Sequence, residues 1–249
     1  MMNILFTLCG RAGSKGLKSK NLLSILDKPL IDYGISLIEL YIDTHPSDQV
    51  HIALNTDSDE LKKQAISRNS EIVIIERTEA LANDTVGKIE VIRDTFFKMK
   101  QKKEVIYDFI IDLDLTSPLR TLPDLNGLIE KYMNSQNTDL IFSVVPSRRN
   151  PFFNMVKLDG NQVSLAIKSQ FTSRQQAPDV YDINGSMYLY KPLFLENNTY
   201  LFDGIIDLFV MKDYKVLDID DKEDFEWMNF LMPKFLSDDP ELKRVYLKR

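Results

Sequence analysis

NILFTLCGRAGSKGLKSKN, residues Asn3–Asn21, is the stretch that decides the fold prediction. Its first part, Asn3–Cys9, is a short apolar run ended by a glycine, which is the pattern of a buried strand. In an open α/β sheet, ligands bind beyond the carboxyl ends of the strands, and glycines let backbone N–H groups approach an anion closely. The loop after this strand, Gly10–Asn21, has three glycines and the basic residues Arg11, Lys15, Lys18 and Lys20. The stretch therefore predicts a triphosphate site after the first strand of an α/β sheet.

The glycine spacing argues against two better-known phosphate loops. Gly10, Gly13 and Gly16 are spaced G-x-x-G-x-x-G, unlike the G-x-G-x-x-G of dinucleotide-binding folds. No G-x-x-x-x-G-K-[ST] sequence of a P-loop is present either. The alternative interpretation is a solvated basic loop without a ligand.

Strand and helix patterns alternate along the first 145 residues. Short apolar runs predict strands, and apolar residues at helical spacing predict helices between them. The predicted strands are 3–9, 50–55, 71–76, 108–113 and 140–145, and the predicted helices are 29–41, 58–68, 87–99 and 122–135. This order indicates a doubly wound, mostly parallel Rossmann-like sheet with helices on both faces.

The alternation stops after Pro146 and returns near Ser186. Between them the chain is polar, with two short alternating runs, 152–158 and 162–167, joined by an Asp-Gly pair that favours a hairpin. The continuation predicts a strand at 186–190, a helix-like segment at 202–210, a strand at 215–219 and a helix at 222–232. We therefore expect one domain, residues 1–249, with an inserted dimerisation arm at about 147–181.

Composition limits the possible partners. The chain has a formal net charge of −6, which disfavours nucleic-acid binding because phosphate neutralisation needs a basic face. No apolar run reaches the roughly 18 to 20 residues of a membrane span, and the amino terminus lacks the organisation of a signal peptide, so we expect a cytoplasmic protein. Cys9 is interpreted as a small buried residue rather than a nucleophile, and His45 and His51 as structural or surface residues.

Two acidic pairs stand near predicted strand ends. Asp112 and Asp114 share a strand face, which suits either a metal site or a helix start built on Thr121 and Asp124. Asp218 and Asp220 also alternate, and two carboxylates on one face repel each other unless a cation lies between them. The alternative for this second pair is helix capping, for which the next residue, Asp221, is also available.

A polar segment that begins within the predicted arm and ends at the following strand could contact a carboxylated polyol. Arg174 lies in the sequence RQQAP, and Asn184 lies in YDINGS at the start of a predicted strand. An arginine suits a carboxylate. Asn-Gly is also a common turn, so this segment alone leaves function open.

Together these segments resemble the acylneuraminate cytidylyltransferases, also called CMP-sialic acid synthetases. That family carries R-x-G-S-K-G-x-x-x-K-N after its first strand, present here from Arg11 to Asn21. Five further family motifs follow in order over nearly the whole chain. The family's R-P-x-x-L-A-x-D appears here as RTEALAND at 77–84, and its Q-P-T-S-P-L-R appears as DLTSPLR at 114–120. The others are N-P-x-x-N-M-V at 150–156, R-Q-x-A-P with D-x-N-G-S at 174–186, and D-x-D at 218–220.

The resemblance implies that the anomeric hydroxyl of an acidic nine-carbon sugar attacks the α-phosphorus of CTP, and that pyrophosphate leaves. It also implies a fold of the nucleotide-diphospho-sugar transferase type. Because a two-stranded hairpin is marginal alone, we expect the arm to pack on a second copy and form a homodimer, with a lid folded on its own subunit as the alternative. We expect the Asp218–Asp220 pair to hold Mg²⁺ or Mn²⁺. The roles that the resemblance implies are catalytic for Arg11, Lys15, Lys20 and Asp220; nucleotide binding for Cys9, Gly10, Arg11, Gly13, Ser14, Lys20, Asn21, Arg77 and Lys88; substrate binding for Asp114, Thr116, Lys168, Arg174, Gln175, Tyr181, Asn184 and Ser186; and metal binding for Asp218 and Asp220.

Two departures from the family pattern bear on the sugar. Asp114 stands where the family has glutamine, and Lys88 stands where a serine is common. Both resemble variants in enzymes for bacterial relatives of sialic acid such as legionaminic acid. We expect Lys88 and Asp114 to interact with each other or both to touch the sugar or metal, with independent exposure to water as the alternative. The rival functions are a cytidylyltransferase for another sugar acid or a small phosphorylated alcohol, and a catalytically silent nucleotide-binding protein.

Overall fold

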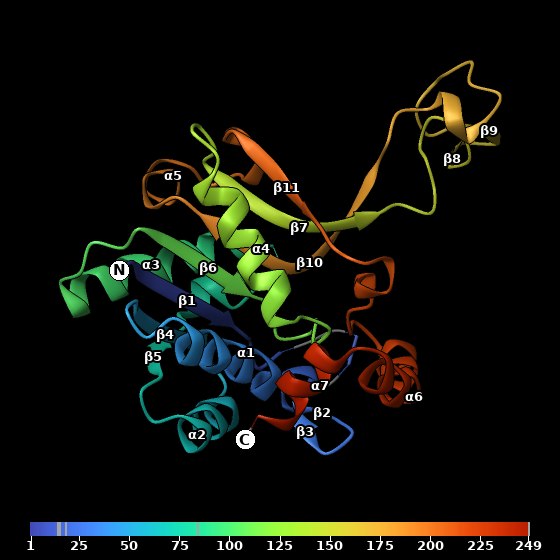
Figure 1. Cartoon of the computed structure of the whole chain (residues 1–249). Coiled ribbons are helices and arrows are strands. Elements are labelled where there is room, and N and C mark those ends of the chain that lie inside the picture. The colour runs from blue at the N-terminus through green and yellow to red at the C-terminus, as the bar shows by residue number, and fades with distance from the viewer. Residues whose placement is uncertain (14–15, 18, 84, 249) are drawn as a thin grey trace.

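The computed structural model describes residues 1–13, 16, 17, 19–83 and 85–248. Its centre is a sheet with the strand order β11-β7-β10-β6-β1-β4-β5 (Figure 1). These strands are β1 (Asn3–Cys9), β4 (Gln49–Thr56), β5 (Val73–Glu76), β6 (Phe109–Leu113), β7 (Leu140–Pro146), β10 (Tyr181–Tyr190) and β11 (Ile206–Val210). β10 runs antiparallel to both of its neighbours, and the remaining pairings are parallel. The predicted mostly parallel sheet is confirmed.

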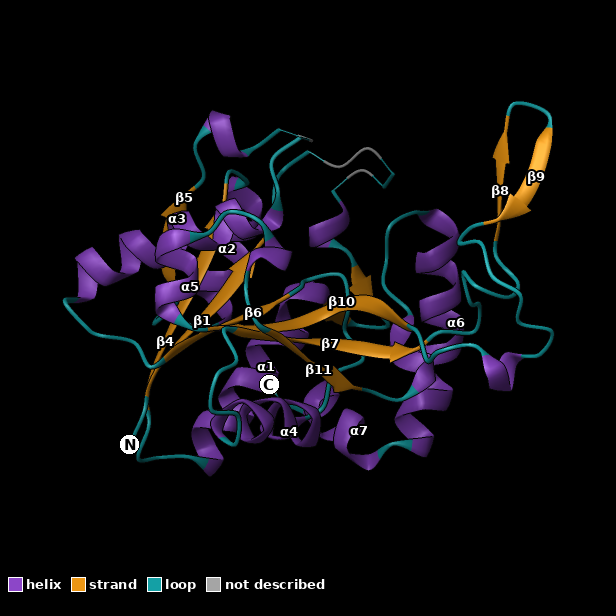
Figure 2. Cartoon of the chain, turned by 90° about the horizontal axis from the view of Figure 1, so that it is seen from above, coloured by secondary structure: helices purple, strands orange, loops and turns teal. Residues whose placement is uncertain are grey.

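Helices cover both faces of this sheet. α1 (Leu30–Thr44), α4 (Leu122–Met133) and α7 (Pro240–Leu247) lie on one face, and α3 (Lys88–Lys103) and α5 (Pro192–Asn197) lie on the other (Figure 2). α2 (Asp59–Arg68) packs beside α1, and α6 (Lys222–Asp238) packs against α7. Within the described residues, no helix is both long enough and apolar enough to cross a bilayer.

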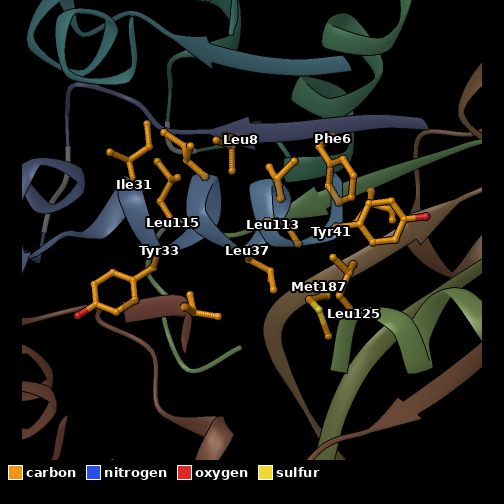
Figure 3. Close-up of a cluster of buried hydrophobic side chains, with 14 of the residues drawn as sticks. Phe6, Leu8, Ile31, Tyr33, Leu37, Tyr41, Leu113, Leu115, Leu125 and Met187 are labelled. Carbon is orange, nitrogen blue, oxygen red and sulfur yellow. The ribbon is translucent and has the colours of Figure 1, made fainter. Parts of the chain in front are cut away.

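Alternate residues of β1 supply the two cores. Phe6 and Leu8 point into the larger core, where they meet α1 residues such as Leu37 and Tyr41 (Figure 3). Leu5 points into the smaller core beneath α3 and α5. Burial on both faces explains why the strand reads as a continuous apolar run.

Side-chain caps set the starts of four described helices, α2, α4, α6 and α7. The Ser58 hydroxyl accepts a hydrogen bond from the Leu61 amide at the start of α2. Thr121 and Asp124 form a capping box before α4, and Asp221 and Asp224 form another before α6. The predicted capping roles of Thr121, Asp124 and Asp221 are therefore confirmed.

Two predicted elements in the last quarter of the chain are wrong. Residues 202–210, expected to be helix-like, form a short 3-10 turn, η4 (Leu201–Asp203), followed by the edge strand β11. Pairing with β7 satisfies the backbone of β11, and this long-range contact outweighs local helical spacing. Residues 215–219, expected to be a strand, form η5 (Asp213–Val216) and an unpaired extended segment. β10 fills the position between β6 and β7, so this segment lies outside the sheet.

The predicted hairpin is present but shorter than expected. β8 (Val156–Asp159) and β9 (Gln162–Leu165) pair antiparallel around Gly160, whose φ of 58° suits glycine. The hairpin projects from the body of the molecule on two connecting segments, and η3 (Arg174–Gln176) lies on the returning one (Figure 1). Small elements also follow the glycine loop: η1 (Lys20–Leu22), β2 (Ser24–Ile25) and β3 (Lys28–Pro29); η2 (Glu79–Leu81) lies before α3.

Candidate active site

A polar cavity of about 320 Å³ lies at the carboxyl ends of β1 and β6, where an α/β sheet binds ligands. Segments far apart in the sequence form its wall. The lining residues are Cys9, Gly10, Arg11, Lys20, Asn21, Arg77, Leu81, Asn83, Val86, Lys88, Val91, Asp114, Thr116, Asp218 and Asp220. The structure thus brings the glycine loop and both acidic pairs to one place.

The glycine loop packs too tightly for side chains at two of its glycines. A Cβ at Gly10 would lie 2.7 Å from the Leu115 side chain. A Cβ at Gly16 would lie 2.4 Å from the backbone oxygen of Asp220, so a larger residue would push the loop away from the acidic segment. The Asn21 side chain donates to the Arg11 carbonyl at 3.0 Å and closes the loop on itself. Ser14 and Lys15 lie outside the described residues, and the exposed Gly13 is not part of the cavity wall.

Lys20 connects the glycine loop to the second acidic pair. Its Nζ lies 2.8 Å from Asp220 Oδ1, and most of the lysine side chain is buried. A cation held at the cavity wall suits an anionic ligand. The contact also places Asp220 beside the cavity although it lies 200 residues away in sequence.

Arg77 is fixed by a residue that the sequence analysis missed. Its Nε donates to Asn55 Oδ1 at 2.8 Å, and its Nη2 donates to the Asn55 carbonyl at 3.0 Å. Asn55 is buried and donates in turn to Thr95 Oγ1 at 3.0 Å. The sequence signal for Asn55 was its position as a polar residue near the end of the strand β4, after the apolar run that precedes it.

Lys88 forms ion pairs with both carboxylates of the first acidic pair. Its Nζ lies 2.6 Å from Asp114 Oδ2 and 2.8 Å from Asp112 Oδ2. Asp112 is fully buried and accepts a 2.7 Å hydrogen bond from Thr7. The expected contact between Lys88 and Asp114 is therefore confirmed, and independent exposure to water is ruled out.

Burial and pairing act in opposite directions on these charges. Burial alone would raise the pKa of Asp114, but Lys88 and two hydrogen bonds from Thr116 bring that pKa well below its usual range. Burial alone would lower the pKa of Lys88, but Asp112 and Asp114 raise it well above its usual value. Asp114 is thus a fixed acceptor and Lys88 a fixed donor.

Asp218 differs from the other carboxylates of the cavity. Burial, followed by the nearby charges of Asp220 and Asp114, raises the pKa of Asp218 to about 6. No hydrogen bond or ion pair reaches its carboxylate from the described part of the chain. A half-buried, unpaired carboxylate beside a second one is a donor set that fits a divalent cation, with the remaining ligands supplied by phosphate and water. Across the described residues, no group of three or more His, Cys, Asp or Glu side chains forms a closed metal site.

Cys9 lies at the cavity wall and is half-buried rather than fully buried. Burial, and then the charge of Asp112, raises the pKa of the Cys9 thiol. A protonated thiol is a poor nucleophile, which agrees with the interpretation of Cys9 as a packing residue. Both histidines contact neighbouring tyrosines: His45 stacks on Tyr41, and His51 meets Tyr107.

The remaining predicted substrate residues lie away from this cavity. Lys168, Arg174 and Gln175 are in the arm, and the guanidinium of Arg174 donates to the Arg148 carbonyl at 2.6 Å. Tyr181 begins β10 at the base of the arm. Asn184 is 3% exposed, and its amide bonds Ser143 at 2.7 Å and the Lys215 carbonyl at 3.0 Å. Ser186 is also buried, and its carbonyl accepts from Arg120 at 2.7 Å.

Comparison with known proteins gives close relatives by sequence. Two proteins are 37% identical to this chain, in alignments that cover 93% of this chain and 96% of each relative. One is the post-translational flagellin modification protein B of Campylobacter coli. The other is the CMP-N,N'-diacetyllegionaminic acid synthase of Campylobacter jejuni.

Solved structures share the fold at lower identity. The CMP:2-keto-3-deoxy-manno-octonic acid synthetase complexed with CTP superposes with a TM-score of 0.66 at 15% identity, covering 93% of this chain and 99% of that one. A 4-diphosphocytidyl-2C-methyl-D-erythritol synthase superposes with a TM-score of 0.62 at 13% identity, with the same coverage. The family model described as cytidylyltransferase matches residues 8–249, nearly the whole chain. This chain is therefore a member of the cytidylyltransferase family and a nucleotidyltransferase enzyme.

Proposed function

We propose that this enzyme transfers CMP from CTP to an acidic nine-carbon 2-keto sugar of the sialic or legionaminic acid type and releases pyrophosphate. The observation that carries the proposal is the single cavity that joins the basic glycine loop, Arg77, the Lys88–Asp114 pair and the Asp218–Asp220 pair. The similarity to the Campylobacter jejuni synthase supports the legionaminic type of sugar. CTP is a cytoplasmic substrate, so we place the reaction in the cytoplasm.

In this reaction the anomeric oxygen forms a bond to the α-phosphorus and loses its proton, while the bond to the β-phosphate oxygen breaks. The chain's part is positioning and charge stabilisation. Lys20 and Arg11 line the cavity and suit the triphosphate, whose charge shifts to the leaving pyrophosphate. Lys15 is assigned the same role from the sequence motif.

Asp218 and Asp220 would hold a Mg²⁺ or Mn²⁺ ion, which when bound polarises the α-phosphate. The Lys20–Asp220 contact keeps Asp220 at the cavity wall in the absence of such an ion. When phosphates arrive, Lys20 can turn from this carboxylate to a phosphate oxygen, since lysine is a flexible point charge. Asp218 has no protein partner to give up in the described structure.

We also propose a homodimer formed through the arm. Val156, Leu158 and Val163 of the hairpin are 66%, 71% and 67% exposed. A two-stranded hairpin is marginally stable alone, and such apolar exposure favours packing on another surface. An apolar hollow of about 510 Å³ at the base of the arm, lined in part by Met155 and Ile183, offers a surface on a second copy. A dimer of this kind would carry Lys168, Arg174 and Gln175 toward a partner's sugar site.

The test is pyrophosphate release from CTP, ATP, GTP and UTP, each combined with N-acetylneuraminate, legionaminic acid, pseudaminic acid and the eight-carbon acid Kdo. We expect release with CTP and a nine-carbon acid. Faster release with CTP and Kdo than with any nine-carbon acid would show that the substrate is another sugar acid. No release with any acid, from protein that still binds CTP, would favour a silent nucleotide-binding protein.

A further inference from the structure

The segment that carries Asp218 and Asp220 lies outside the sheet, between η5 and α6. No described strand pairs with it, so it lacks the ladder of hydrogen bonds that would fix a strand. One backbone hydrogen bond, from the Ile219 amide to the Thr116 carbonyl at 3.0 Å, joins it to the cavity wall. Both aspartates line the cavity, and two nearby carboxylates repel each other. Other contacts are therefore needed to keep the two carboxylates together.

The middle and the far end of this segment are held by short-range contacts. Ile219 is 0% exposed and belongs to the larger core. Side chains alternate along an extended segment, so burial of Ile219 turns Asp218 and Asp220 to the side of the cavity. The Asp224 carboxylate accepts hydrogen bonds from the amides of Asp220 and Asp221, at 2.9 Å and 3.0 Å. Hydrophobic packing has no preferred direction, so burial of Ile219 does not by itself fix the position of the segment along the wall.

The near end is held by Lys215, three residues before Asp218. Lys215 is 3% exposed, and its ammonium forms an ion pair with Asp124 Oδ2. The same ammonium lies 3.5 Å from Thr121 Oγ1. The Lys215 carbonyl accepts a hydrogen bond from the Asn184 amide at 3.0 Å. Both the side chain and the backbone of Lys215 are thus bound to buried groups of other elements.

The partner of Lys215 is itself fixed by the start of α4. Asp124 Oδ2 accepts hydrogen bonds from the amide and the hydroxyl of Thr121, at 2.9 Å and 2.6 Å, in the capping box. α4 lies against one face of the sheet (Figure 2). A buried ion pair is screened little by salt and requires good geometry, so it fixes the position of the lysine. The sheet therefore sets the position of Lys215 through α4.

We propose that Lys215 is a positioning residue, which through its ion pair with Asp124 holds Asp218 and Asp220 in the arrangement that binds a divalent cation before the cation arrives. The inference rests on the proposed function, because it takes these two aspartates as the metal ligands. Lys215 is absent from the cavity wall, so it acts through the segment and not on the substrates. Asn184, expected from the sequence to bind the sugar, supports the backbone of Lys215 in this scheme.

The test is the affinity for CTP, measured by calorimetry in EDTA and in Mg²⁺, without a sugar and therefore without turnover. The ratio of the two affinities reports the coupling between metal and nucleotide. We expect Lys215→Met to lower this ratio about tenfold and to leave the affinity in EDTA nearly unchanged. Lys131→Met is the matched control. Lys131 also lies on α4, pairs with Asp207 at 2.9 Å and is absent from the cavity wall, so its ratio should equal that of the wild type.

A double variant separates positioning from simple stabilisation of the fold. Lys215→Met with Asp124→Asn removes both charges, so neither is left buried without a partner. The amide oxygen at position 124 can still accept from Thr121 and cap α4. The urea midpoint should return close to the wild-type value, whereas the Mg²⁺ ratio should stay low because no ion pair remains. A ratio that recovers together with the stability overturns the inference, since Lys215 would then only stabilise the fold.

Hydrogen exchange of the unaltered protein covers the case in which neither variant folds. Amides in residues 217–220 should be protected without Mg²⁺ and should gain little protection when Mg²⁺ and CTP are added. Protection that appears only with the metal would contradict a pair that is positioned in advance.

Failure of the proposed function gives different results. A wild type whose CTP affinity does not respond to Mg²⁺ rejects the proposed metal pair and this inference together. A normal response that Lys215→Met shares rejects the inference alone. A wild-type response that is lost in Lys215→Met, from an enzyme that releases pyrophosphate with no sugar acid, supports the inference while the proposed reaction fails.

Discussion

Replacing Lys88 by methionine should destabilise the folded protein, because it leaves two carboxylates facing each other around the place of the ammonium. Asp112 is 0% exposed, and Asp114 lies 2.6 Å from the same ammonium. Breaking a buried ion pair from one side costs about 3–5 kcal/mol. Since Lys88 itself is 32% exposed, water offsets part of this loss, and we expect about 2–4 kcal/mol.

The destabilisation should shrink as the pH falls. In the wild type, the pKa of Asp114 is lower in the folded state than in the unfolded state, where it is about 3.9. The interactions of the ionised carboxylate therefore stabilise the fold fully above this unfolded-state pKa. That stabilisation is lost as the pH falls through the folded-state pKa. Without the ammonium, two adjacent carboxyl groups fold most easily when one is protonated, so the variant gains stability on acidification. Cys9 and Tyr188 stay neutral over this range, because burial raises the pKa of both.

Urea denaturation followed by far-ultraviolet circular dichroism at pH 8 and pH 5.5 measures both effects. The double variant Lys88→Met with Asp112→Asn should recover most of the loss, because a neutral pair of similar volume avoids the uncompensated charge. Lys98→Met serves as the surface control and should cost no more than about 0.5 kcal/mol. A loss below about 1 kcal/mol for Lys88→Met, or a loss that grows toward pH 5.5, would refute the reasoning.

Three further predictions concern the reaction and the assembly. Lys20→Ala should lower the rate of pyrophosphate release by about two decades or more, whereas Lys222→Ala, outside the cavity, should stay within threefold of the wild-type rate. Equal rates for the two variants would show that Lys20 has no role in the reaction. Asp220→Asn should keep the wild-type circular dichroism spectrum and raise the Mg²⁺ concentration for half-maximal activity, and full wild-type activity in EDTA would defeat the metal assignment. Light scattering at micromolar concentration should give a dimer mass, and Leu158→Glu should shift it toward the monomer, since the charge would be buried at the interface; a wild-type monomer would make the arm a lid on its own subunit.

The sequence by itself determined the elements whose signals are local. The apolar run Asn3–Cys9 became β1 at the predicted bounds, and the caps at Thr121 and Asp221 start the helices expected of them. The order of the motifs also identified the family that the comparisons confirm. Such features are readable because periodicity, capping and loop chemistry depend on neighbours within a few residues.

Tertiary structure alone decided where segments with weak local signals belong. β10 lies between β6 and β7, which buries Asn184 and leaves no place in the sheet for residues 215–219. β11 is a strand because the edge of β7 pairs with it, not because its own spacing requires one. Likewise, the sequence suggested a contact between Lys88 and Asp114, but not that Asp112 shares the ammonium. Position in a ladder and the partners of a buried charge are set by residues distant in the chain, which outweigh local propensity.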